Sequence, residues 1–470
     1  MEYGLWHTLT QAAVLNRLWF TVWQSSLTVV IALAVGGSLA ILERWLHQTT
    51  PRWFVGLCSL IVFLPPIIVT TSFIITYGQA GILNAGLTQL GLTPIHLLYT
   101  KAAVLLAHSY YNIPLAFIVL RTALAAVPTK LEDSSAIIGA SRWQKWTLVY
   151  WPYLRLPLLG VSALIFLYCF TSFIVPLQLG GHQAQTLEVW LYQEIYLYHR
   201  YVSAAWIAGT QFFILAGGVA LLLWAQPKIL SLNQPHATNS TSSTSANFAI
   251  KICRLGLASF LTLPITMLLL HSVQQFFADQ LNILAQTQFF AGLGRSLVIA
   301  ACALTITIVS VWSVRLSGTI GLALVALSPI TLAFVWLFTF GKGYISLIGA
   351  FIIALVPVVS IIFQTVKARQ PRFLTTTARL LGASLWQQRL LEWQLTKPAL
   401  RRCLAIGSII VIGDATISSM LAKTDQPLAM PVVLQLISSY RFGLGSLALL
   451  LLLLLFFLII NLVYAHDHTA

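Results

Sequence analysis

Long apolar runs without charge recur along the whole chain, and they constrain its fold more than any other feature. Of its 470 residues, 58% are hydrophobic and only 8% are charged. In a soluble chain of this length, about a quarter of the residues would be charged. The sequence therefore predicts an all-α polytopic membrane protein and excludes soluble enzymes, disordered scaffolds and secreted disulfide modules.

Eleven of these runs are long enough to cross a bilayer, for which about 20 apolar residues are needed. The expected transmembrane helices lie at about 18–41, 53–77, 101–123, 156–177, 204–225, 255–276, 296–314, 320–340, 345–366, 404–422 and 446–464. The pair Pro65 and Pro66 predicts a kink in the second of them, because proline removes a helical hydrogen bond.

The distribution of Lys and Arg predicts the orientation. The net charge is +15, and with a periplasmic N-terminus and a cytoplasmic C-terminus 19 of the 26 Lys and Arg residues fall on the inner side. Cytoplasmic loops of membrane proteins are enriched in these residues. Membrane topology thus explains the excess of positive over negative residues. No nucleic-acid partner is expected, because no basic run is present.

The five cysteines give no sign of chemistry. Cys58, Cys169, Cys253, Cys302 and Cys403 are far apart in sequence and lie in or beside apolar runs. Their spacing fits neither a metal site nor a disulfide framework. No cofactor, metal site or catalytic residue is expected.

A polar tract divides the chain into two similar halves. Residues 231–247 are rich in Ser, Thr and Asn, which is typical of a flexible linker. We therefore expect a first transmembrane unit at 1–230, a cytoplasmic linker at 231–250 and a second unit at 251–470. The sequence GASRWQ at 139–144 returns as GASLWQ at 382–387, and Pro114 and Pro357 share the same offset. Matches that recur in order predict two tandem units in the same orientation.

Each half has a long loop on the predicted cytoplasmic side, at 124–155 and 367–403. Both loops mix apolar and aromatic residues with cations and contain few helix breakers. They are expected to form amphipathic helices, which can lie on the membrane surface or dock into a partner. Docking is favoured because the element is duplicated and its sequence is more specific than lipid binding requires.

The first loop resembles the loop of ABC-importer permeases, whose pattern is E-A-A-x3-G-x9-I-x-L-P. Asp133, Ser134 and Ser135 precede Gly139 at this spacing, and Pro152 ends the pattern. In the second loop Gly382, Ala383 and Trp386 repeat the centre of the element, but the acid is missing and Pro398 comes three residues late. The resemblance implies that these eight residues couple the chain to an ATPase, with the second loop as a degenerate copy.

Further segments resemble the fused permeases of bacterial thiamine importers, within the binding-protein-dependent transport permeases. They are Tyr77–Gly81, Ala107–His108, Asn112–Ala116, Cys169–Phe173, Leu179–Gly181, Thr186–Glu188, Ile412–Asp414 and Ser438–Arg441. The resemblance covers nearly the whole chain. Those permeases begin with one additional helix, so either this chain lacks that helix or its start lies further upstream.

The resemblance implies a transport subunit of the bacterial inner membrane that carries thiamine or its phosphates. The chain lacks the phosphate loop G-x-x-x-x-G-K-[ST], so it is not expected to be an enzyme, and ATP would be hydrolysed by a separate subunit. The implied partners are two copies of a cytoplasmic ATP-binding subunit, a periplasmic substrate-binding protein and the lipid bilayer. A tight bend at each glycine would let the short helix seat on the ATPase.

Three residues inside predicted spans are candidates for the translocation pathway. Asp414 is the one acid deep in a span, and buried charge in a membrane usually has a function. It either faces a cationic substrate or bonds a neighbouring helix through Ser418 or Ser419. His108 and Asn112 share one helix face, although a packing role is the more common one for a membrane histidine.

Two other functions stay open from the sequence. A ferric-iron ABC importer permease has the same fused architecture and the same loop. An ion-coupled secondary transporter usually carries several intramembrane carboxylates and often inverted repeats, and both features are missing here. A membrane-embedded enzyme is disfavoured because no His, Asp and Glu cluster lies within the spans.

Overall fold

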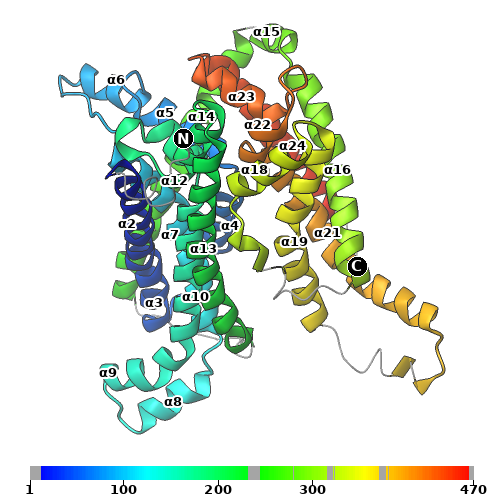
Figure 1. Cartoon of the computed structure of the whole chain (residues 1–470). Coiled ribbons are helices and arrows are strands. Elements are labelled where there is room, and N and C mark those ends of the chain that lie inside the picture. Colours follow the sequence, from blue (N-terminus) through cyan, green and yellow to red (C-terminus); the bar gives the residue numbers. More distant parts are fainter. Residues whose placement is uncertain are drawn as a thin grey trace. The chain divides into compact units, whose positions relative to one another are not determined.

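The computed structural model describes residues 12–230, 244–278, 280–314, 321, 323–369, 377–378 and 380–464, and most of them lie in helices. No strand occurs among them. The predicted all-α polytopic fold is confirmed. Figure 1 shows the long helices of each part of the chain running roughly side by side.

Nine helices in the described part of the chain are long and apolar enough to cross a membrane, compared with the eleven that were predicted. The nine are Val14–Trp45, Pro66–Gln89, Lys101–Ala125, Arg142–Phe170, Tyr201–Trp224, Phe248–Phe277, Phe289–Val314, Tyr344–Val366 and Phe442–Val463. Three shorter apolar helices accompany them among the described residues, Arg52–Phe63, Pro329–Phe340 and Ala429–Ser438.

The predicted spans at 320–340 and 404–422 are not among these nine. Helix α18 covers only Pro329–Phe340, because Ser328 caps its first turn and Pro329 occupies the first helical position. Residues 320 and 322 of that span lie outside the described residues. The span at 404–422 is broken at Asp414, which separates α21 (Leu385–Gly413) from α22 (Thr416–Leu421).

The expected kink at Pro65 and Pro66 is a complete break. Helix α4 (Arg52–Phe63) ends before the two prolines, and α5 (Pro66–Tyr77) begins at the second. Pro65 has extended backbone angles, with φ −55° and ψ 136°. Proline disfavours the helical conformation of the residue before it, so Pro66 accounts for this geometry.

The chain divides into two compact units, Met1–His271 and Ser272–Ala470. Residues 231–243 of the predicted linker lie outside the described residues, whereas residues 244–250 already belong to α14 (Thr244–Phe277). The division falls at 271/272 because the first part of α14 packs in unit 1. The assignment of two functional permease units to 1–230 and 251–470 stays a prediction.

Unit 1 is built around α7, which packs with α2, α4 and α10. A Cβ at Gly36 would lie 2.2 Å from the carbonyl oxygen of Ile113, so glycine is required where the two backbones approach. The helices and turns of this unit, besides α4 and α5, are α2 (Ala12–Ala32), η1 (Leu33–Gly37), α3 (Ser38–Trp45), α6 (Ile82–Gln89), α7 (Lys101–Ala125), α8 (Thr129–Ile137), α9 (Arg142–Lys145), η2 (Trp146–Tyr150), α10 (Trp151–Phe170), α11 (Ile174–Leu179), η3 (His182–Ala184), α12 (Leu187–Tyr196) and α13 (Tyr201–Leu230).

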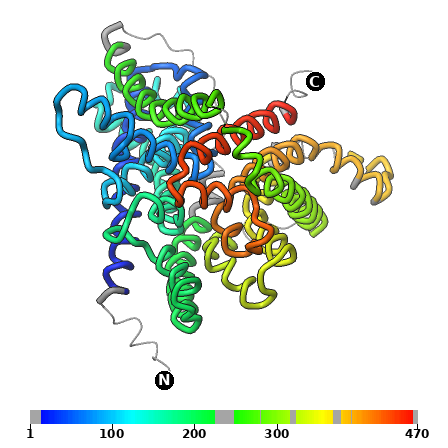
Figure 2. Tube along the Cα trace, turned by 90° about the horizontal axis from the view of Figure 1, so that it is seen from above, coloured from blue at the N-terminus to red at the C-terminus, as the bar shows by residue number. Residues whose placement is uncertain are grey.

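In unit 2, α16, α19 and α21 pack against one another; Figure 2 shows them in green, yellow and orange. Gly407 allows α21 to approach α16, since a Cβ there would lie 2.2 Å from the side chain of Leu304. The further elements of this unit are α15 (Gln280–Gln286), α16 (Phe289–Val314), η4 (Leu324–Ala326), α19 (Tyr344–Arg369), α23 (Ala429–Ser438) and α24 (Phe442–Tyr464).

The same elements follow one another in the two units. Helices α10 and α21 end at Phe170 and Gly413, which are 243 residues apart, and each is followed by a six-residue helix. Helices α11 and α22 begin 242 residues apart, as do α12 and α23. His199 and Tyr440, which precede α13 and α24, share the left-handed conformation, with φ 52° and 60°. The duplication inferred from short sequence matches therefore extends to the backbone.

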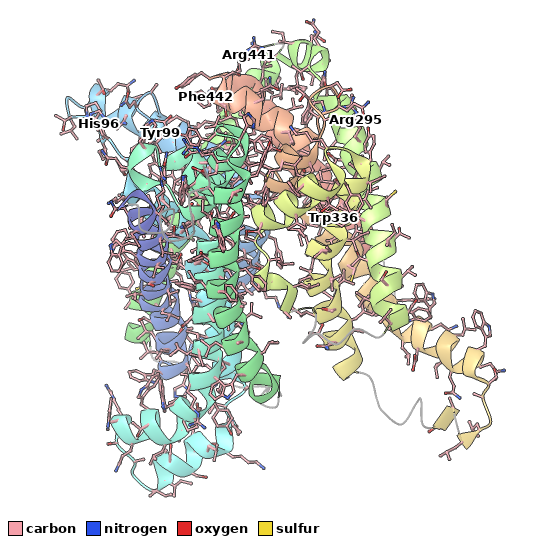
Figure 3. All side chains as sticks on the ribbon, viewed as in Figure 1. His96, Tyr99, Arg295, Trp336, Arg441 and Phe442 are labelled. Carbon is pink, nitrogen blue, oxygen red and sulfur yellow. The ribbon has the colours of Figure 1, made fainter. Side chains whose placement is uncertain are left out.

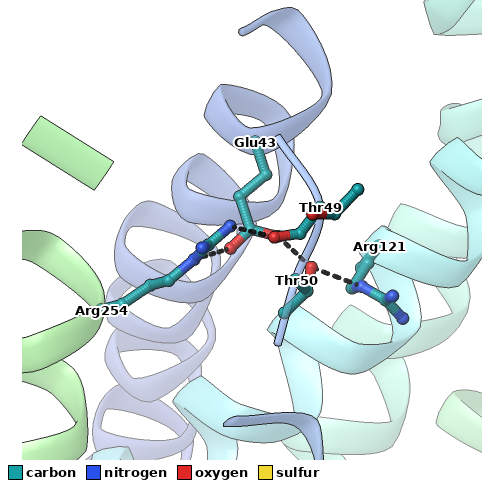
Figure 4. Close-up of polar contacts among 5 residues, drawn as sticks. All are labelled: Glu43, Thr49, Thr50, Arg121 and Arg254. Carbon is teal, nitrogen blue, oxygen red and sulfur yellow. Dashed lines mark hydrogen bonds and ion pairs between the residues drawn. The ribbon is translucent and has the colours of Figure 1, made fainter. Parts of the chain in front are cut away.

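A buried ion pair holds α14 in unit 1. Nε of Arg254 lies 2.6 Å from Oε1 of Glu43 at the end of α3. Nη2 of Arg254 donates to the Thr49 carbonyl, and the hydroxyl of Thr50 donates to Oε2 of Glu43 at 2.5 Å. Nε of Arg121 donates to the same hydroxyl oxygen at 2.8 Å. Figure 4 shows that this network joins α3, α7 and α14.

Candidate functional site

The repeated six-residue element forms a helix–turn–helix elbow in unit 1. Gly139 ends α8 with φ +74°, a conformation that glycine adopts without strain. The amide of Ala140 donates to the Ser135 carbonyl at 2.9 Å, and that of Gly139 donates to the Ala136 carbonyl at 3.0 Å. These two bonds form a Schellman motif, which satisfies the last carbonyls of α8.

Ser141 then starts the next helix. Its hydroxyl oxygen accepts from the Gln144 amide at 3.3 Å, and the Gln144 side chain accepts from the Ser141 amide at 2.8 Å. This reciprocal pair is a capping box. The elbow is thus specified locally, because its Gly, Ser and Gln each satisfy the backbone at the bend.

Unit 2 contains the same elbow. Gly382 has φ +77°, and the Ala383 amide donates to the Ala378 carbonyl at 3.0 Å. Ser384 and Gln387 form the second capping box, with the same two distances as the first. Residues 370–376 and 379 of the predicted loop 367–403 lie outside the described residues.

Local backbone geometry does not explain the tryptophan of the element. Trp143 and Trp386 both occupy the second position of the new helix, and their side chains are 73% and 74% exposed. The residues just before each glycine are equally exposed, with Ile138 at 83% and Leu381 at 81%. Each elbow therefore presents an apolar surface, which we define as Ile137, Ile138 and Trp143 in unit 1 and Leu380, Leu381 and Trp386 in unit 2.

An ion pair fixes the first elbow to the helical body of its unit. Nη2 of Arg44, the residue beside Glu43, lies 2.7 Å from Oε1 of Glu132 in α8. The same guanidinium donates to the Val127 carbonyl at 3.3 Å. Beyond α9, the ring of Trp146 packs edge-on against Trp45, with 5.9 Å between centroids. Helix α3 thus holds the elbow through Arg44, and it holds α14 through the neighbouring Glu43.

The remaining residues of the predicted coupling set have less specific surroundings. Asp133 and Ser134 are exposed on α8, and the Ser135 hydroxyl donates to the Glu132 carbonyl. Pro152 lies in the first turn of α10, directly after the π-helical segment Trp146–Tyr150. A π-helical turn accommodates the missing amide of a proline within a continuous helix. The coupling role of all eight residues stays a prediction.

His108 and Asn112 lie together in a buried polar cluster of unit 1. Nδ1 of His108 lies 2.7 Å from Oε1 of Gln24 in α2, whose amide nitrogen donates to the Cys169 carbonyl at 3.0 Å. The Asn112 amide donates to the His108 carbonyl and to Sγ of Cys169. The cluster ties α2, α7 and α10 together. This arrangement favours a packing role, although Nε2 of His108 has no hydrogen-bond partner among the described residues.

Asp414 lies in unit 2, where the helix breaks. Its backbone angles are φ −79° and ψ 121°, and its Oδ2 accepts from the Ser418 amide at 3.1 Å. The residue at the N-cap of α22 is Ala415, so Asp414 lies one position before it, and its carboxylate accepts from an amide of the first turn and complements the helix dipole there. The partner of this carboxylate is the backbone amide of Ser418, and the choice between a pathway role and a structural role for Asp414 stays a prediction.

Sequence reasoning missed three buried acids. Glu43 pairs with Arg254, Glu188 accepts from the Gln211 amide, and Glu194 accepts from the indole nitrogen of Trp190 at 3.1 Å. All three are at most 4% exposed. Glu188 and Glu194 lie in α12, a ten-residue helix outside the predicted spans. Only Glu188 belongs to a segment singled out by its sequence, Thr186–Glu188, and none of the three lies within a predicted span.

The part of the chain that the structure describes contains no group of three or more His, Cys, Asp or Glu residues placed to hold a metal ion. The polar clusters found there instead connect helices to one another.

Comparison with known proteins identifies relatives along nearly the whole chain. A thiamine transport system permease protein of Haemophilus influenzae is 26% identical, over 94% of this chain and 86% of its own length. The corresponding proteins of Escherichia coli and Salmonella typhimurium are 27% and 28% identical, each over 98% of this chain and over 88% and 90% of their own lengths. The predicted resemblance to the thiamine permeases is confirmed. No protein-family model matches the chain.

Proposed function

We propose that this chain is the permease subunit of an ATP-driven, binding-protein-dependent importer that brings thiamine or its phosphates into the cytoplasm. The nine sufficiently long apolar helices among the described residues support a transport role in the membrane. The three relatives named above are permeases of thiamine transport systems. These names favour thiamine over ferric iron as the cargo and transport over catalysis.

The observation that carries the proposal is the repeated elbow with its exposed apolar surface. Burying a large apolar side chain contributes about 1.5–3 kcal/mol, so three such side chains left in water at each elbow are suited to a partner. An amphipathic helix that lays its apolar face into a groove is a recurrent recognition mode. We propose that the partner docked on each elbow surface is one ATP-binding subunit. The whole chain then binds two copies of this subunit.

In this mechanism, closure of the two ATP-binding subunits on ATP moves the elbows. Unit 1 transmits the movement through the ion pair between Arg44 and Glu132 and through the continuous helix Arg142–Phe170. In unit 2, α21 runs directly from its elbow to Asp414, so that it acts as a single lever of 29 residues. Hydrolysis then returns the elbows to their starting positions.

We place the elbows in the cytoplasm, the N-terminus in the periplasm and the chain in the bacterial inner membrane. His96 and Tyr99 lie at the end of unit 1 opposite α8 and α9, and Arg295 and Arg441 lie at the end of unit 2 opposite its elbow (Figure 3). These opposite ends would face the periplasm, where a substrate-binding protein delivers the cargo.

The test is co-purification of the ATP-binding subunit with the membrane-inserted chain. Trp143→Glu places a charge in the apolar surface of the first elbow, and we expect the complex to retain one ATP-binding subunit instead of two. Trp143→Phe keeps an apolar ring and serves as the matched control, for which both copies should be retained. Two copies bound to a Trp143→Glu, Trp386→Glu double variant would contradict the docking role.

A further inference from the structure

A groove of about 570 Å³ runs along the outside of α10 in unit 1. It is lined by Trp151, Arg155, Leu156, Leu158, Leu159 and Ser162 of α10 and by Trp224 of α13. The α10 residues recur at the spacing of one helix face. None of them belongs to the elbow surface or to the buried polar cluster, and the proposed transport function assigns no role to their side chains.

The length of the groove matches one leaflet of a bilayer. Residues 151 and 162 are eleven positions apart, which corresponds to roughly 16 Å along a helix axis. The hydrocarbon core of a membrane is about 30 Å thick, so the groove spans about half of it. An occupant of this length extends from the membrane surface to the region of the bilayer midplane.

The lining side chains change along the groove from aromatic to cationic to apolar, which matches the order of headgroup and acyl chain in a phospholipid. The exposed rings of Trp151 and Trp224 lie at the elbow end, as is typical of residues at a membrane surface. Arg155 follows one turn further, and its side chain leans back toward the helix N-terminus and hence toward the same surface. The leucines come next, and the Ser162 hydroxyl is already bonded to the Leu158 carbonyl at 2.7 Å, so that the inner end is apolar.

The charge of Arg155 has no partner within the described part of the chain, where it forms neither an ion pair nor a hydrogen bond. An uncompensated guanidinium beside a strip of leucines favours an amphiphile with an anionic head. A free phosphate ester would leave the leucines without a partner. An apolar helix of another protein would leave the cation without one.

We propose that this groove binds an anionic phospholipid of the leaflet on the elbow side, with Arg155 at the phosphate and an acyl chain along Leu156, Leu158 and Leu159. Trp151 directly follows the π-helical segment that joins α9 to α10. The bound lipid therefore contacts the helix that carries the first elbow at the point where this helix enters the membrane.

The test is lipid retention by the purified full chain, measured by native mass spectrometry with equal amounts of dioleoyl phosphatidylglycerol and dioleoyl phosphatidylcholine. The wild-type chain should retain phosphatidylglycerol preferentially. Arg155→Gln should lower this preference roughly fivefold, the effect expected for one basic residue near a membrane surface. Arg155→Lys should keep most of it. Arg142→Gln, which removes an exposed cation of the elbow outside the groove, should leave it unchanged.

A second variant tests the apolar part of the groove. Leu159→Trp fills the strip where the acyl chain would lie, so the retention of both lipids should fall while the chain stays monodisperse. An unchanged phosphatidylglycerol preference in Arg155→Gln would overturn the proposal. So would binding of glycerol 3-phosphate that competes with the lipid, or association of two copies of the chain that Leu159→Trp abolishes.

Discussion

Each residue of the repeated element G-A-S-x-W-Q can be given a role from its geometry, with one exception. The glycine adopts φ +74° or +77°, the alanine amide closes the Schellman bond, and the serine and glutamine form the capping box. The tryptophan contributes to none of these and is largely exposed in both copies. The bend is therefore specified by backbone chemistry, whereas the tryptophan is available for a partner.

The role of Asp414 can be tested by replacing its charge while keeping its hydrogen bond. The side-chain oxygen of asparagine can accept from the Ser418 amide as the carboxylate does, so Asp414→Asn should insert normally and import substrate at close to the wild-type rate. Asp414→Ala loses the bond to the Ser418 amide, and its stability should fall by about 1 kcal/mol. Uptake and thermal stability in membranes provide the two measurements. A well-inserted Asp414→Asn variant with no uptake would show that the charge itself is needed, as a pathway role requires.

At the scale of elements, the ion pair between Glu43 and Arg254 attaches the first part of α14 to unit 1. Both side chains are buried, and breaking a buried pair from one side typically costs on the order of 3–5 kcal/mol. We expect Glu43→Ala to lower the unfolding temperature of the purified chain strongly. The double variant Glu43→Ala, Arg254→Ala should lose less than the two single changes together, because it leaves no uncompensated charge.

Asp425→Ala is the control for this experiment, since it removes an exposed acid and should leave the unfolding temperature unchanged. Additive losses in the double variant would contradict a direct pairing of Glu43 and Arg254.

The position of most helices could be predicted from hydropathy, but the breaks within them could not. The run 404–422 reads as continuous because Gly413 and Asp414 are flanked by apolar residues, although one helix ends at Gly413 and the next begins at Thr416. The buried pair of Glu43 and Arg254 joins residues 211 positions apart, and a single sequence carries no signal for such a contact. The elbows were found in advance because their bonds are local, and local bonds leave a recurring pattern of residue types.

At the scale of the whole molecule, the duplication predicts which residues share a side of the membrane. We expect single cysteines at Ile138 and Leu381, introduced into a chain without its native cysteines, to react with membrane-impermeant reagents only from the cytoplasm. Cysteines at the exposed positions Leu90 and Tyr440 should react only from the periplasm. Labelling of Ile138 and Leu381 from opposite sides would exclude two units of the same orientation.

The most direct test of the account is ATP-dependent uptake of radiolabelled thiamine in a host that lacks its own importer. The host would express this chain with its ATP-binding subunit and its binding protein, and the chain would be either wild-type or Gly139→Asp, which places a charge in the middle of the first elbow. The account predicts uptake by the wild-type complex and none by the variant at equal amounts in the membrane. Normal uptake by the variant, or import of ferric iron instead of thiamine by the wild-type complex, would contradict it.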